Sequence, residues 1–170
     1  MCGVVGIVGT QSDGWIDGMN KINFHRGPDD EGIFRDRVAN VSLAMRRLAV
    51  IDISDGCQPM STRDGRFTIV FNGEIFNAPE LRLELEAEGV QFFTDHSDTE
   101  VLLQMLVRDG TRALPRLNGM FAFALWDSVH QELTCARDRF GIKPFYYIAK
   151  NERFAFASEL KSLLTLPWLE

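Results

Sequence analysis

Cysteine is scarce in this 170-residue chain, with three residues at positions 2, 57 and 135. Because the count is odd and no Cys-x-x-Cys pair occurs, we expect neither a disulfide framework nor a zinc site. Such cysteine usage favours a reducing cytoplasm. We interpret Cys57 and Cys135 as small buried or half-buried thiols. Only Cys2 has a position that indicates chemistry.

Excess basic charge and long apolar runs are also missing. The chain has 18 Lys and Arg against 24 Asp and Glu, a net charge of −6, so nucleic acid is not an expected partner. The longest apolar run, residues 120–126, is too short to span a bilayer, and the first residues do not have the pattern of a secretory signal. Repeats, low-complexity tracts and linkers are absent as well. We therefore expect one cytoplasmic domain over residues 1–170, without a membrane partner.

The sequence does contain many short apolar segments separated by turn residues. We expect strands at 3–8, 33–34, 41–45, 48–52, 67–71, 120–126, 132–136, 145–149 and 153–157. Helices are expected at 13–21, 78–88, 99–108 and 159–164, with a further helical turn at 111–116 and loops at 25–32 and 137–144. The run 97–100 matches a capping box, and Ser158 is the expected cap of the last helix.

Several of these strands are apolar throughout. Residues 4–8, 69–71 and 121–126 do not alternate apolar with polar side chains, which is typical of strands buried on both faces. Spacing like that of hairpins favours antiparallel pairing. Two antiparallel sheets packed together with helices outside would satisfy both observations. We therefore predict an α+β protein built as a four-layer αββα sandwich.

Cys2 directly follows the initiator methionine. Its side chain is small, so we expect an aminopeptidase to remove Met1 and leave a free α-amine beside the thiol. The amine has a reference pKa of about 7.7–8.0 and a free thiol one of about 8.5, so the amine can accept the proton of the thiol near neutrality. One residue would then supply nucleophile and base. The alternative is a chance second residue on an apolar strand.

Such a nucleophile needs groups that stabilise an oxyanion and anchor a substrate. The amide of Asn72 and the backbone N–H of Gly73 can both point at a developing negative oxygen, although Asn-Gly is also a common turn. Arg47 can bind a carboxylate through two hydrogen bonds. Arg46, beside it, is a competing choice.

Two carboxylates complete the candidate set. Glu74 and Asp98 can hold a substrate ammonium, although Asp98 also suits the first turn of a helix. His25 allows a Cys/His pair, but it fits equally well as a residue that organises its own loop. One guanidinium with two carboxylates matches an α-amino acid head group. Glutamine or a close relative is the expected substrate if these residues converge.

Seven short stretches follow one another along the chain: Met1-Cys2-Gly3, His25-Arg26-Gly27-Pro28-Asp29, Arg47-Leu48-Ala49-Val50-Ile51-Asp52, Asn72-Gly73-Glu74-Ile75-Phe76-Asn77, Ser97-Asp98-Thr99-Glu100, residues 118–124 and residues 137–144. Together they resemble the class II glutamine amidotransferase domain, an N-terminal-nucleophile hydrolase. Within that family the chain resembles the amino-terminal half of glutamine-hydrolysing asparagine synthetases.

This resemblance implies an αββα fold and a role for each candidate. Cys2 would attack the side-chain amide of L-glutamine and form a thioester, releasing ammonia and then glutamate. Asn72 and Gly73 would form the oxyanion hole. Arg47 would bind the substrate carboxylate, and Glu74 and Asp98 its ammonium. The resemblance further implies a pocket lined by the main chain of three residues, Ala49, Val50 and Ile51.

The chain departs from the family pattern in two ways. Met45 stands where many relatives have a histidine, which we do not expect to remove activity. The family's second domain uses ATP and Mg²⁺, and its Ser-Gly-Gly-type loop does not occur before Glu170. We therefore expect a fragment, an excised domain or a free-standing subunit that needs no cofactor or metal itself.

The expected partner is a synthetase domain or subunit that receives the ammonia released by this domain; the sequence does not indicate which acceptor it aminates. A homodimer is compatible with the family. Two alternatives stay open. One is an N-terminal-nucleophile acylase that acts on another amide. The other is a domain that binds glutamine without turning it over.

Overall fold

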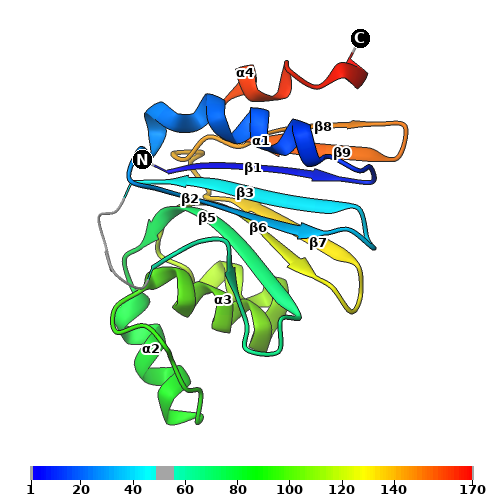
Figure 1. Ribbon diagram of the computed structural model, residues 1–170. Helices are drawn as coiled ribbons and strands as arrows, with labels where there is room; N and C mark the ends of the chain where they lie inside the picture. Colours follow the sequence, from blue (N-terminus) through cyan, green and yellow to red (C-terminus); the bar gives the residue numbers. More distant parts are fainter. Residues whose placement is uncertain (1, 49–55, 170) are drawn as a thin grey trace.

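The computed structural model of the chain describes residues 2–48 and 56–169 (Figure 1). Two antiparallel sheets form the middle of this described part. The first has the order β2-β3-β1-β9-β8 and contains β1 (Gly3–Val8), β2 (Asp30–Asp36), β3 (Val41–Arg47), β8 (Tyr146–Lys150) and β9 (Arg153–Ala157). The second has the order β4-β5-β6-β7 and contains β4 (Met60–Ser61), β5 (Phe67–Ile75), β6 (Gly119–Asp127) and β7 (Glu132–Arg137).

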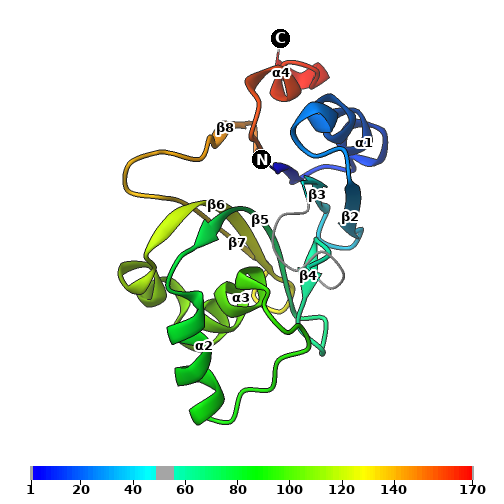
Figure 2. The same ribbon diagram turned by 90° about the vertical axis from the view of Figure 1, so that its left-hand side faces the viewer.

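Helices cover the outer faces of both sheets. Figures 1 and 2 show α1 (Asp13–Ile22) and α4 (Leu160–Leu163) over the first sheet, and α2 (Ala78–Ala87) and α3 (Asp98–Asp109) over the second. The described part also contains the 3₁₀ helices η1 (Asn23–Arg26), η2 (Gly110–Arg116) and η3 (Pro167–Leu169). The predicted four-layer αββα sandwich is therefore confirmed.

The central strands bury both of their faces. On β6, Phe121 and Phe123 pack toward α2 and α3, while Ala124 and Trp126 pack against the first sheet. Because successive side chains of a strand point to opposite faces, an apolar strand can fill two cores at once. Each large side chain buried this way contributes about 1.5–3 kcal/mol relative to exposure. This explains the apolar runs that do not alternate.

The ends of several elements differ from the prediction. Strand β2 begins at Asp30 and η1 ends at Arg26, so the segment expected as the loop 25–32 is largely structured. Pairing with β3 extends β2 over residues whose composition favours a turn. Strand β4 was not expected, because only two residues pair with β5. The expected strand 48–52 is not seen at Leu48, and 49–52 lie outside the described residues.

The predicted capping box is wrong in its chemistry. Ser97 is the N-cap of α3, but its side chain makes no capping hydrogen bond. The carboxylate of Glu100 instead accepts hydrogen bonds from the backbone of Phe93 and from both the backbone and hydroxyl of Thr94. Ser158 was expected to cap the last helix, but the N-cap residue of α4 is Glu159. The hydroxyl of Ser158 accepts the N–H of Val4 in β1 instead. In both places a partner outside the helix takes the expected capping group.

Candidate active site

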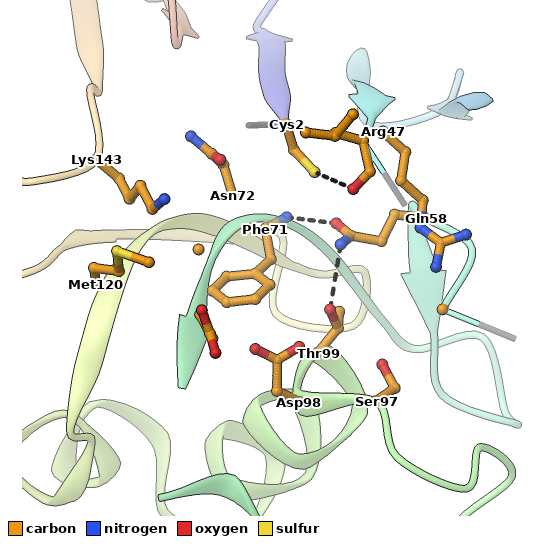
Figure 3. A pocket seen from close by; sticks show the side chains of 14 residues that line it. Cys2, Arg47, Gln58, Phe71, Asn72, Ser97, Asp98, Thr99, Met120 and Lys143 are labelled. Atoms are coloured by element: carbon orange, nitrogen blue, oxygen red, sulfur yellow. Dashed lines mark hydrogen bonds between the residues drawn. The ribbon is translucent and has the colours of Figure 1, made fainter. Parts of the chain in front are cut away.

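A cavity of about 270 Å³ opens where β1 begins, between the two sheets and the start of α3 (Figure 3). Six of the residues predicted for the site line it: Cys2, Arg47, Asn72, Gly73, Glu74 and Asp98. They come from the start of β1, the end of β3, the second half of β5 and the first residue of α3. Residues separated by up to 96 positions thus meet in one pocket.

Cys2 is held in place through its main chain. The neighbouring Gly3 pairs with Arg46 of β3, which puts Cys2 next to Arg47 at the end of that strand. The carbonyl of Cys2 accepts a hydrogen bond from Nε of Arg26 at 3.0 Å. The same guanidinium donates to Glu159 at 2.8 Å and holds the pKa of that carboxyl below its usual value. Contacts with β3 and Arg26 therefore fix the position of the Cys2 backbone.

Asn72 presents a buried hydrogen-bond donor to the pocket. The residue is 1% exposed, and its side-chain nitrogen Nδ2 has no hydrogen-bond partner among the described residues. A buried donor without a partner costs about 1–3 kcal/mol. Such a donor is well suited to an oxygen that arrives with a ligand and gains charge during a reaction.

Gly73 brings the two strands of the second sheet close together at the pocket. A Cβ at this position would lie 2.3 Å from the carbonyl oxygen of Met120 and 2.8 Å from the Cα of Phe121. Both are backbone atoms, so a larger residue would displace β6 from β5. The glycine therefore lets β5 and β6 approach closely beside the pocket that Gly73 itself lines.

Asp98 is a buried carboxyl at the N-terminus of α3. One of its oxygens accepts the N–H of Ile75 at 3.0 Å, which joins the helix to the end of β5. Burial and, to a smaller extent, the nearby carboxylate of Glu74 raise the pKa of Asp98 to about 6, although the backbone N–H donors act in the opposite direction. Two carboxyls in one pocket attract a cation. An α-ammonium group has the required charge and hydrogen-bond donors.

The structure distinguishes between the two neighbouring arginines. Arg47 is 5% exposed and lines the pocket. Arg46 points to the opposite face of β3, where it pairs with Glu31 at 2.5 Å and covers the ring of Phe24. Because strand side chains alternate, only one of the two can reach the site. The choice of Arg47 agrees with this geometry.

His25 does not line the cavity. Its ring contacts Glu159 at 3.3 Å and the carbonyl of Ile22 at 3.1 Å, and about half of its side chain is exposed. The Cys/His pair that the sequence allowed is therefore not formed in this structure. His25 instead organises its own segment, as the alternative interpretation held.

Sequence reasoning missed several lining residues. Gln58 accepts the N–H of Phe71 at 2.7 Å and donates to the hydroxyl of Thr99 at 3.2 Å, so it connects β5 with α3 under the pocket. Nothing in the sequence around Gln58 indicated this role. Lys143 and Met120 also line the cavity, and both stand in stretches that carried the resemblance. Their presence in those stretches was the available signal.

Other predictions have mixed outcomes. Ala49, Val50 and Ile51, expected to line the pocket, lie outside the described residues. Cys57 is exposed, so its assignment as a buried or half-buried thiol is wrong. Cys135 is half-buried as expected, and burial raises its pKa to about 12. No helix in residues 2–48 and 56–169 is long and apolar enough to cross a membrane.

Comparison with known proteins gives consistent matches over nearly the whole chain. The family model described as "Glutamine amidotransferase domain" matches residues 1–170. Asparagine synthetase [glutamine-hydrolyzing] 1 of Bacillus subtilis is 46% identical over 96% of this chain, which spans 27% of that protein. A putative asparagine synthetase [glutamine-hydrolyzing] of Mycobacterium tuberculosis is 40% identical, and the chain spans 26% of it. The chain thus spans about a quarter of the length of these relatives.

The solved structures that resemble the chain support the same fold. Glutamine phosphoribosylpyrophosphate amidotransferase from B. subtilis, solved with ADP and GMP, superposes with a TM-score of 0.75 at 21% identity. The match covers 95% of this chain and 43% of that one. At this identity the likeness shows that the two chains share a fold.

Proposed function

The chain belongs to the glutamine amidotransferase domain family, and from this premise we propose that it hydrolyses L-glutamine through Cys2 and delivers ammonia to a synthetase domain or subunit. The single observation that carries the proposal is the shared pocket of Cys2, Arg47, Asn72 and Asp98. The pocket contains a thiol, a carboxylate-binding group, an oxyanion donor and an ammonium-binding group together. Glutamine needs all four.

The proposed reaction begins once removal of Met1 frees the α-amine of Cys2. The amine takes the thiol proton as sulfur attacks the γ-carbonyl carbon, and the carbonyl electron pair moves onto oxygen. The amide of Asn72 and the main chain of Gly73 stabilise that oxygen. When the intermediate collapses, the C–N bond breaks and the amine returns its proton to the departing nitrogen as ammonia. Water then attacks the thioester and releases glutamate and the free thiol.

Substrate orientation comes from the opposite end of the ligand. Arg47 binds the α-carboxylate, and Asp98 with Glu74 binds the α-ammonium. Binding both ends fixes the amide carbon in front of sulfur, which lowers the entropic part of the barrier. The half-reaction uses neither nucleotide nor metal. We assign ATP and Mg²⁺ to the synthetase domain that receives the ammonia. Because the relatives are named asparagine synthetases, we propose that the whole protein forms asparagine, and we place it in the cytoplasm.

The decisive experiment measures glutamate release by the chain from which Met1 has been removed. Cys2→Ala is expected to abolish release while the thermal unfolding midpoint stays unchanged. Cys57→Ala serves as the matched control, because Cys57 is an exposed thiol, and this variant should retain activity. Retained glutaminase activity in Cys2→Ala would refute the role given to this residue.

The alternatives give different results in related assays. An acylase of another amide would hydrolyse that amide faster than glutamine. Loss of selectivity for glutamine in Arg47→Ala would instead support the glutaminase. If the domain only binds glutamine, mass spectrometry of protein purified from the cytosol should detect Met1 still attached. Such a domain would also escape labelling of Cys2 by a glutamine-mimicking electrophile.

A further inference from the structure

Lys143 brings a buried cation into the pocket that none of the roles above uses. The residue is only 6% exposed, and Figure 3 shows its side chain directed into the cavity. No hydrogen bond or ion pair joins its ammonium to another residue in the described part of the chain. Burying an ammonium group without a partner is costly. A negatively charged group that forms in the pocket would offset that cost.

The loop that carries Lys143 is built to hold it. The carboxylate of Asp138 is 5% exposed and accepts the backbone N–H groups of Phe140, Ile142 and Lys143. The guanidinium of Arg137 donates to the carbonyl of Lys143. These bonds determine the backbone on both sides of the side chain. Lys143 therefore enters the pocket from a fixed loop.

The same loop is attached to the strand that faces the proposed oxyanion hole. The N–H of Asp138 donates to the carbonyl of Phe121 at 2.7 Å, and the N–H of Phe121 donates back to its carboxylate at 3.2 Å. Phe121 is the register partner of Gly73, and Ala122 is that of Asn72. In Figure 3 Lys143 lies on the side of Asn72, across the pocket from Arg47. Its charge thus belongs to the amide end of the bound substrate.

We propose that Lys143 is a further catalytic residue, whose ammonium stabilises the negative oxygen formed when Cys2 attacks the γ-carbonyl of glutamine. This proposal rests on the function proposed above. In the step it serves, a C–S bond forms, the carbonyl electron pair moves to oxygen and the thiol proton goes to the α-amine of Cys2. Lys143 keeps its proton throughout. The carbonyl of the substrate is neutral, so the contact strengthens only as charge develops.

The test compares Lys143→Met and Lys143→Arg with wild type, all without Met1. Removing one oxyanion donor lowers kcat by about 10²–10³-fold, so we expect Lys143→Met to lose about 10²-fold in kcat with little change in KM. Lys143→Arg keeps the charge and should recover part of the rate. Lys161→Met is the matched control, since Lys161 is exposed on α4 and its loss should leave kcat unchanged.

A second measurement separates catalysis from structure. Glutamate γ-semialdehyde is a glutamine analogue whose aldehyde can react with the Cys2 thiol to give a hemithioacetal. The oxygen of this adduct would occupy the position of the negative oxygen formed from glutamine. The affinity for the aldehyde should fall in Lys143→Met by a factor similar to the loss of kcat, while glutamine binding in the Cys2→Ala background stays unchanged. If Lys143→Met does not fold, Lys143→Gln, which removes the charge but keeps a polar chain, undergoes the same assays.

The outcomes distinguish the two proposals. A folded uncharged variant with wild-type kcat and aldehyde affinity overturns the role of Lys143 and leaves the function of the domain standing. Wild-type protein that neither releases glutamate nor binds the aldehyde overturns both. Equal losses of glutamine and aldehyde binding would also count against the proposal, because they would indicate a role in the ground state only.

Discussion

Replacing Asp98 with asparagine should make the protein more stable at neutral pH and worse at binding its substrate. Asp98 is 8% exposed, and burial is the main reason that its pKa rises from 3.8 to about 6. The fold therefore favours the neutral acid. An asparagine oxygen can still accept the N–H of Ile75, so the substitution removes the charge and keeps this hydrogen bond.

The size of the effect follows from the pKa. One pKa unit corresponds to about 1.4 kcal/mol, so a rise of about two units amounts to at most about 3 kcal/mol. Because the folded-state pKa of this acid is raised, its stability contribution is fully present below the unfolded pKa and is lost as the pH rises through about 6. The stability of Asp98→Asn relative to wild type should therefore increase between about pH 4 and pH 7, by at most about 3 kcal/mol.

Urea unfolding of wild type and Asp98→Asn at a series of pH values measures this difference directly. Asp95→Asn is the matched control, because Asp95 is an exposed acid just before α3. Its stability difference from wild type should change little with pH. In the Cys2→Ala background, glutamine should bind wild-type Asp98 more tightly as the pH rises through about 6, and Asp98→Asn should not show this rise.

The reasoning would be refuted if the stability difference between Asp98→Asn and wild type were the same at pH 4 and pH 7. It would also be refuted if the Asp98→Asn variant bound glutamine with the same affinity as the protein with Asp98. The first result would mean that burial does not perturb Asp98, and the second that its charge has no part in holding the ligand.

Two further predictions concern the groups around the nucleophile. Asn72→Ala should lower kcat by about 10²–10³-fold in steady-state kinetics. Its thermal unfolding midpoint should stay close to wild type, because the amide nitrogen of Asn72 has no hydrogen-bond partner among the described residues. Glu159→Gln should weaken the support that Arg26 gives to the Cys2 carbonyl, so kcat should fall with KM nearly unchanged and Glu159→Asp should restore part of it. An equal rise in KM would instead indicate a general loosening of the pocket.

Sequence patterns predicted most of the fold because the central strands have an unusual composition. Apolar residues at consecutive positions of β1 and β6 indicated burial on both faces, and the packing of Phe123 and Trp126 on opposite sides confirms it. The ends of elements were less predictable. Glu100 matched a capping box locally, but it bonds residues 93–94, and a local pattern cannot report that competition.

The site divides in a similar way. Cys2 could be proposed as the nucleophile from its position in the chain, since removal of the initiator methionine would combine its thiol with a free amine. The choice between Arg46 and Arg47 depended on which face of β3 meets the second sheet. Gln58 and Lys143 were not assigned any role, because each reaches the pocket through contacts between separate segments. Gln58 bonds Phe71 of β5, and the loop of Lys143 is joined to β6 through Asp138 and Phe121.

The sequence by itself thus determined the type of chemistry and the layered architecture, since both depend on residue type and short-range periodicity. Tertiary structure alone decided which side chains share the cavity, which donor is left unpaired there and which acid is buried enough to shift its pKa. Those properties arise from contacts between segments far apart in the chain, and such contacts have no local signature.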